Sequence, residues 1–182
     1  MKARTKDGAE IFYELYDFTD PWKPAETILL HHGGRGNHKQ SYKWIPLLSG
    51  HYRTIALDAR GRGNSTIPPE DHKWSVERFA SDVVAILDDA EIDRVHFVGN
   101  SFGSIVGENF AANHPDRIRT LSLLAPTYRW NVYHCMPENH AITVQGSLCR
   151  RHGWLPDPTN EIVATCVEML RGGAARAAHK TT

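Results

Sequence analysis

The chain has 182 residues, in which 21 lysines and arginines are balanced by 21 aspartates and glutamates. This length supports one sizeable core and argues against two independent domains. Because the formal net charge is zero, no global field attracts nucleic acid or an anionic membrane, and we expect neither as a partner. No apolar run is long enough to cross a bilayer and the first residues are too polar for a signal peptide, so the sequence predicts a cytoplasmic protein.

The first two thirds of the chain predict strands that alternate with helices. Lys6-Asp7-Gly8 indicates a turn, and the β-forming residues 11–16 predict a strand that leaves a hairpin. Further expected strands are 27–32, 52–58, 94–98 and 118–124, and the expected helices are 42–48, 75–87, 102–113 and 159–170. Ser75 is the expected N-cap of its helix, with Glu77 and Asp82 on the polar side. This alternation predicts an α/β domain with a mostly parallel sheet.

The regular pattern fades beyond Pro126. We expect a core over residues 1–127, a partial lid or irregular helical region over 128–172, and a frayed tail over 173–182. Residues 141–146 are compatible with one further strand.

The segment Gly99-Asn100-Ser101-Phe102-Gly103 matches the pattern G-x-S-x-G, and it follows a predicted strand and opens a predicted helix. A sharp turn there forces strained backbone angles on Ser101, while the glycines let the chain pass close by. The Ser101 hydroxyl would then project at the carboxyl edge of the sheet, where the helix N-terminus favours developing negative charge. The sequence therefore predicts Ser101 as a nucleophile.

A second motif, His31-His32-Gly33-Gly34-Arg35-Gly36, follows an earlier predicted strand. Such a loop can present a backbone N–H to the same crevice, and we expect Gly34 and Phe102 to donate the two N–H groups of an oxyanion hole. His32 and Gly33 are expected to support this loop. The glycines lack the lysine and hydroxyl residue of a Walker motif and do not match the spacing G-x-G-x-x-G, which argues against nucleotide binding.

With a third motif, Asp58-Ala59-Arg60-Gly61-Arg62-Gly63-Asn64-Ser65, the chain resembles the α/β-hydrolase superfamily over roughly residues 5–127. In detail it looks most like the enol-lactonase and carbon–carbon bond hydrolase branch. The resemblance implies the α/β-hydrolase fold and a hydrolase that acts on a small ester, lactone or similar carbonyl substrate through an acyl-enzyme on Ser101, without a cofactor. Asp58, Arg60 and Ser65 are expected to brace the loop beside the site.

A nucleophilic serine needs a histidine base and an acid that orients it, and the resemblance implies that both follow Ser101 in the chain. The expected acid is absent from Gly146-Ser147-Leu148-Cys149. The remaining candidates, none of them in the expected setting, are Asp157, Glu161, His134, His140, His152 and His179. No metal motif appears, and the three widely spaced cysteines indicate ordinary thiols.

Three explanations are compatible with a site that has a predicted nucleophile but no recognisable base or acid. The chain is a truncated hydrolase that lacks the last strands and is impaired if it is complete, a rearranged hydrolase that recruits His134, His140 or His152, or a non-catalytic binding protein on the same scaffold. We favour truncation. It predicts that the strand 118–124 is an exposed apolar edge through which the protein could self-associate.

Overall fold

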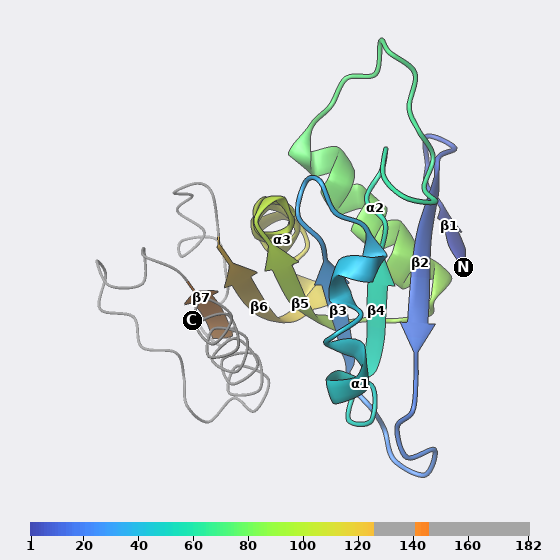
Figure 1. Cartoon of the computed structure of the whole chain (residues 1–182). Helices are drawn as coiled ribbons and strands as arrows, with labels where there is room; N and C mark the ends of the chain where they lie inside the picture. The colour runs from blue at the N-terminus through green and yellow to red at the C-terminus, as the bar shows by residue number, and fades with distance from the viewer. Residues whose placement is uncertain (126–140, 146–182) are drawn as a thin grey trace, which may run out of the picture.

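A computed structural model describes residues 1–125 and 141–145 of the protein. Within these residues the strands form one sheet in the order β1-β2-β4-β3-β5-β6-β7 (Figure 1). The strands are β1 (Lys2–Arg4), β2 (Glu10–Tyr16), β3 (Thr27–His31), β4 (Arg53–Leu57), β5 (Val95–Asn100), β6 (Ile118–Leu124) and β7 (Ala141–Gln145). The pairings of β2 with β1 and with β4 are antiparallel, and every other pairing is parallel.

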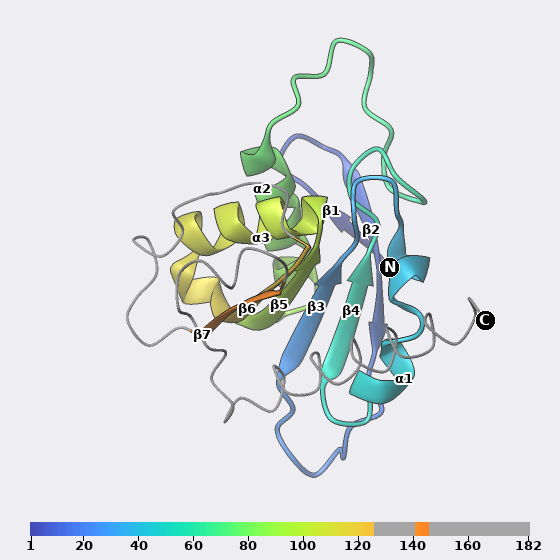
Figure 2. The same cartoon turned by 60° about the vertical axis from the view of Figure 1, so that its left-hand side comes forward.

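Helices lie on both faces of this sheet. The helices α2 (Val76–Asp89) and α3 (Phe102–Asn113) cover one face, and the short α1 (Ile45–Leu48) lies on the other (Figure 2). The central strand β3 is buried along its whole length. Because side chains alternate along a strand, Leu29 joins the larger core beneath α2 and α3, while Ile28 and Leu30 pack with Leu48 of α1. Burial on both faces explains why Ile28, Leu29 and Leu30 of β3 form a continuous apolar run.

Most of the predicted elements are confirmed. The turn at residues 6–8 joins β1 to β2, and Ser75 caps α2 by accepting a hydrogen bond from the Arg78 N–H at 3.3 Å. The expected position of Asp82 on the polar side of its helix is wrong. This residue is buried, because its side chain turns inward to pair with Arg60.

The predicted bare edge at 118–124 is also wrong. Residues Thr120–Leu124 of β6 pair in parallel with Ala141–Gln145 of β7, so β6 has a neighbour on each side. The prediction assumed that the strand next to β6 was missing, but the short segment 141–145 supplies its backbone partners. This strand lies inside the range 128–172 that we expected to be a lid or irregular helical region. The expected boundary at 127, the helix 159–170 and the tail 173–182 lie outside the described residues.

Among the residues that the structure describes, no helix is long and apolar enough to cross a membrane. The same residues contain no group of three or more histidine, cysteine, aspartate or glutamate side chains placed to hold a metal ion.

Candidate active site

Ser101 stands at the sharp turn between β5 and α3. Its backbone angles are φ 51° and ψ −108°, a left-handed conformation that a residue with a side chain rarely adopts. Two backbone hydrogen bonds stabilise the turn: the Ser101 N–H donates to the Leu124 carbonyl at 2.8 Å, and the Ser104 N–H donates to the Ser101 carbonyl at 2.9 Å. The Ser101 hydroxyl makes no capping bond to α3. It is therefore not committed to holding the helix.

The two glycines of the motif have steric reasons to be glycines. A Cβ at Gly99 would lie 2.3 Å from the Gly103 carbonyl oxygen, and a Cβ at Gly103 would lie 2.5 Å from the His31 carbonyl oxygen. Both distances are far below van der Waals contact. The strand β3, the turn and the start of α3 can approach this closely only because neither position carries a side chain.

The loop after β3 lies directly against this turn. A Cβ built on Gly33 would lie 3.6 Å from the Ser101 Cβ, and one built on Gly34 would lie 3.5 Å from the Phe102 Cβ. The Gly33 N–H is occupied, because it donates to Gln40 Oε1 at 2.9 Å. Among the described residues, no acceptor is found for the N–H of Gly34 or of Phe102. The two expected oxyanion donors are thus on neighbouring residues with their N–H groups unused.

The two histidines of this loop are buried and committed to backbone groups. His32 Nε2 accepts a hydrogen bond from the Ala59 N–H at 2.9 Å, so Nδ1 carries the proton and donates to the Gly33 carbonyl at 2.6 Å. His31 Nδ1 lies 2.9 Å from the His32 carbonyl oxygen. Burial lowers the pKa of His31 to about 3 and also lowers the pKa of His32. His32 therefore joins two loops, and neither ring is a free base.

Asp58 is fully buried at the end of β4 and holds its own loop closed. Its Oδ1 accepts from the His38 N–H at 2.6 Å and lies 2.7 Å from His38 Nδ1, while its Oδ2 accepts from the Asn64 N–H at 2.8 Å. The Ser65 hydroxyl donates to the Asp58 carbonyl at 2.6 Å. Gly63 has a φ of +51° and no room for a Cβ beside Asp58. These contacts place Asp58 and Ser65 as braces of the loop.

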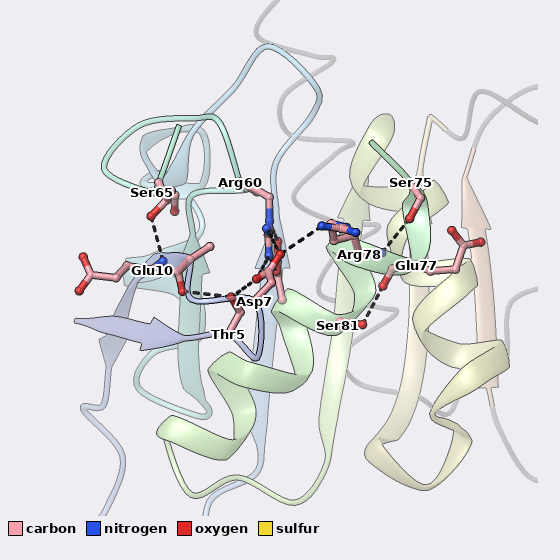
Figure 3. A network of polar contacts seen from close by, with 12 residues as sticks. Thr5, Asp7, Glu10, Arg60, Ser65, Ser75, Glu77, Arg78 and Ser81 are labelled. Atoms are coloured by element: carbon pink, nitrogen blue, oxygen red, sulfur yellow. Dashed lines mark hydrogen bonds and ion pairs between the residues drawn. The ribbon is translucent and has the colours of Figure 1, made fainter. Parts of the chain in front are cut away.

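Arg60 connects the same loop to two other elements. Its guanidinium donates to both oxygens of Asp82 on α2, at 3.0 and 2.6 Å, and to both oxygens of Asp7 in the β1–β2 turn, at 2.5 and 3.0 Å. Figure 3 shows Arg60 above Asp7, with Arg78 reaching the same carboxylate from the side. The hydrogen bonds from Arg60 hold the pKa of Asp7 well below its usual range. All of these Arg60 contacts join the loop after β4 to the β1–β2 turn and to α2.

Two cavities flank the loop that carries Gly33 and Gly34. One, of about 370 Å³, lies on the side of α1 and is lined by Leu30, His31, His32, Gln40, Ser41, Trp44, Val98, Asn100, Leu124 and Ala125. The other, of about 490 Å³, is lined by His32, Gly34, Ala59, Arg60, Gly61, Arg62, Ile67, Pro68, Trp74, Phe79 and Phe102. Both expected oxyanion residues line this second cavity.

Sequence reasoning missed two supporting residues, Gln40 and His38. The Gln40 side chain accepts a hydrogen bond from the Gly33 N–H, and His38 contacts the Asp58 carboxylate through both its backbone N–H and its ring. Both lie in a polar segment that carries no recognisable pattern, so no local signal could have identified them. The six candidates for base and acid, at positions 134, 140, 152, 157, 161 and 179, lie outside the described residues.

Comparison with known families gives one clear match. The family model described as alpha/beta hydrolase fold matches residues 26–150. Among curated proteins, a fluoroacetate dehalogenase from Burkholderia is 33% identical over 106 residues, which are 56% of this chain and 35% of that protein. A 2-hydroxy-6-oxo-2,4-heptadienoate hydrolase from Pseudomonas putida is 39% identical over 100 residues, or 53% of this chain and 36% of that protein. The aligned part therefore spans about a third of the length of these relatives.

Solved structures show the same arrangement. A hydrolase from Pseudomonas aeruginosa superposes with a TM-score of 0.62 at 32% identity, covering 68% of this chain and 44% of that one. The enol-lactonase from Burkholderia xenovorans gives a TM-score of 0.61 at 27% identity, covering 67% of this chain and 45% of that one.

Proposed function

The chain belongs to the alpha/beta hydrolase fold family, and from this premise we propose that it is a serine hydrolase whose nucleophile is Ser101. One observation carries the proposal. The strained Ser101 lies against Gly33 and directly precedes Phe102, which lies against Gly34, and the N–H groups of Gly34 and Phe102 have no acceptor among the described residues. An unused pair of donors next to an uncommitted hydroxyl is the arrangement that stabilises the tetrahedral intermediate of acyl transfer.

The proposed reaction takes a small ester, a lactone or a related carbonyl compound. The Ser101 oxygen bonds to the carbonyl carbon, a base accepts the hydroxyl proton, and the Gly34 and Phe102 N–H groups hold the resulting oxyanion. Collapse of this intermediate breaks the bond to the leaving group, which takes the proton, and leaves an acyl-serine that water hydrolyses. Neither His31 nor His32 is proposed as this base, because both rings are committed to backbone groups.

The side chain at position 101 separates two kinds of chemistry among the relatives. Displacement at a saturated carbon, as in a dehalogenase, calls for a carboxylate nucleophile, whereas attack on a carbonyl suits an activated hydroxyl. Ser101 therefore favours attack on a carbonyl, which suits a relative named as a heptadienoate hydrolase or an enol-lactonase. It does not favour the displacement that the name fluoroacetate dehalogenase implies.

The alternative is a non-catalytic binding protein on the same fold. The two imidazoles of the loop after β3 are committed to backbone groups, and burial lowers the pKa of both, which makes them weak bases and favours this alternative. A binding protein would gain thermal stability when a ligand is added, and it would not convert that ligand to a product.

A fluorophosphonate probe tests the nucleophile. We expect the unaltered protein to be labelled and Ser101→Ala to lose the label, because the probe reacts with an activated serine in an oxyanion hole. Ser81→Ala is the matched control, since Ser81 is exposed on α2 and donates only to the Glu77 carbonyl.

The outcomes separate the candidates. Equal labelling of Ser101→Ala would refute the assignment of the nucleophile. Ser101-dependent labelling together with hydrolysis of 4-nitrophenyl acetate would establish the hydrolase, and the absence of both would favour the binding protein.

A further inference from the structure

The cavity of about 490 Å³ that Gly34 lines has an aromatic wall. The rings of Trp74 and Phe79 stack with their centroids 5.6 Å apart and an angle of 15° between their planes. Phe79 meets Phe102 edge to face, with centroids 4.9 Å apart. Because Phe102 also supplies an expected oxyanion donor, this aromatic wall begins at the reactive end of the site and runs outward to Trp74, in the loop before α2.

Two apolar side chains that line this cavity are exposed to solvent. Ile67 is 80% exposed and Trp74 is 54% exposed, although Trp74 is held in place by close packing on Gly61 and by the His72 ring. Exposed apolar area is unfavourable at roughly 25 cal/mol per Å². A flat apolar compound that covers these side chains would recover part of that free energy, and the volume of about 490 Å³ is that of a small-molecule site.

The charges around the cavity do not balance. Arg60 and Arg62 line it, and no carboxylate does. The Arg60 charge is already neutralised by Asp7 and Asp82. Arg62 is exposed and forms no ion pair with any described residue. A guanidinium that forms no ion pair within the described part of the chain therefore stands at a largely apolar cavity.

We propose that this cavity binds a planar, apolar acid, with its aromatic or conjugated body along Trp74 and Phe79 and its carboxylate paired with Arg62. A guanidinium presents parallel N–H groups that match the two oxygens of a carboxylate. That such an acid is the substrate rests on the proposed function, because its carbonyl would then lie beside Gly34 and Phe102. The binding itself does not depend on Ser101.

Titration calorimetry with 3-phenylpropionate and its neutral isostere 3-phenylpropionamide tests the pocket. We expect the acid to bind roughly tenfold more tightly than the amide, and Arg62→Gln to make the two affinities equal. Trp74→Ala should weaken both ligands by a similar factor, because it removes the shared apolar surface. Arg62 is exposed and contributes only backbone groups to its loop, so the variant should fold normally.

Arg35→Gln is the matched control, since Arg35 is also exposed on the loop beside Gly34 but does not line the cavity. Equal affinities for acid and amide in the unaltered protein would overturn the proposal, as would equal effects of the two arginine variants. Titration and fluorophosphonate labelling of the unaltered protein together separate the two proposals. Preference for the acid with no labelling of Ser101 would leave the pocket and remove the hydrolase, whereas labelling of Ser101 without preference for the acid would do the reverse.

Discussion

Gly103 shows how much of the candidate site depends on a single absent side chain. The His31 backbone passes so close to this position that a Cβ would lie 2.5 Å from the carbonyl oxygen and 2.8 Å from Nδ1. Backbone cannot yield as a flexible side chain can. The contact therefore sets the distance between the loop that carries Gly34 and the turn that carries Ser101.

We expect Gly103→Ala to lower the free energy of unfolding by about 2–3 kcal/mol, because the added methyl group must push β3 and α3 apart. Labelling of Ser101 should fall with it. Urea denaturation measures the first effect and the fluorophosphonate probe the second. Gly50→Ala is the control: nothing lies within 4 Å of its Cβ position, and its stability should be unchanged or slightly higher. Equal stability of the two variants would contradict the steric argument.

Arg60 acts between elements, joining the loop after β4 to the β1–β2 turn and to α2. Its side chain and that of Asp82 are 4% and 5% exposed, whereas the Lys2–Glu10 pair on the hairpin is 50% and 53% exposed. A buried carboxylate without its partner is strongly unfavourable, but an exposed pair is screened by water. The two ion pairs should therefore contribute very differently to stability.

We expect Arg60→Met to destabilise the protein by about 3–5 kcal/mol, and Lys2→Met by less than about 1 kcal/mol. Replacing both partners, Arg60→Met with Asp82→Leu, should recover much of the loss because no buried charge is left alone. Chemical denaturation of the three variants measures these differences. A double variant no more stable than Arg60→Met would show that the loss has another cause.

For the whole molecule, the pH dependence of stability combines groups with opposite signs. Glu108 on α3 is 5% exposed, its Oε2 has no partner among the described residues, and burial raises its pKa to about 7. Its contribution is full below its unfolded value of 4.5 and is lost as the pH rises through 7. Burial lowers the pKa of His31, His32 and His96, so their contribution is full above 6.5 and is lost as the pH falls.

The substitution Glu108→Gln isolates the first effect. The variant should be more stable than the unaltered protein by about 2 kcal/mol at pH 8, and this advantage should shrink below pH 7 and be lost below pH 4.5, where the glutamate becomes neutral in both states. Thermal or urea unfolding across this range gives the difference curve. The exposed Glu70→Gln should give a flat curve. A flat curve for Glu108→Gln as well would show that its carboxyl is not destabilised by burial.

The amino-acid pattern alone predicted most of the order of strands and helices in the described core, together with the family. These depend on neighbours along the chain: apolar runs that end in glycine, three- and four-residue periodicity, and the turn chemistry of residues 99–103. The first strand, Lys2–Arg4, was missed, because three residues are too few to show a period.

Contacts between distant residues were decided only by the tertiary structure. The sheet order brings β7 beside β6 and so covers the edge that we expected to be bare. Asp82 is buried against Arg60, which lies 22 residues earlier in the chain. The side chain of Gln40 accepts the hydrogen bond of the Gly33 N–H, while the Gly34 N–H has no acceptor among the described residues. Local sequence determines which backbone shapes are favourable, but a hydrogen bond or ion pair also needs a partner, and only the folded arrangement of the strands determines where that partner lies.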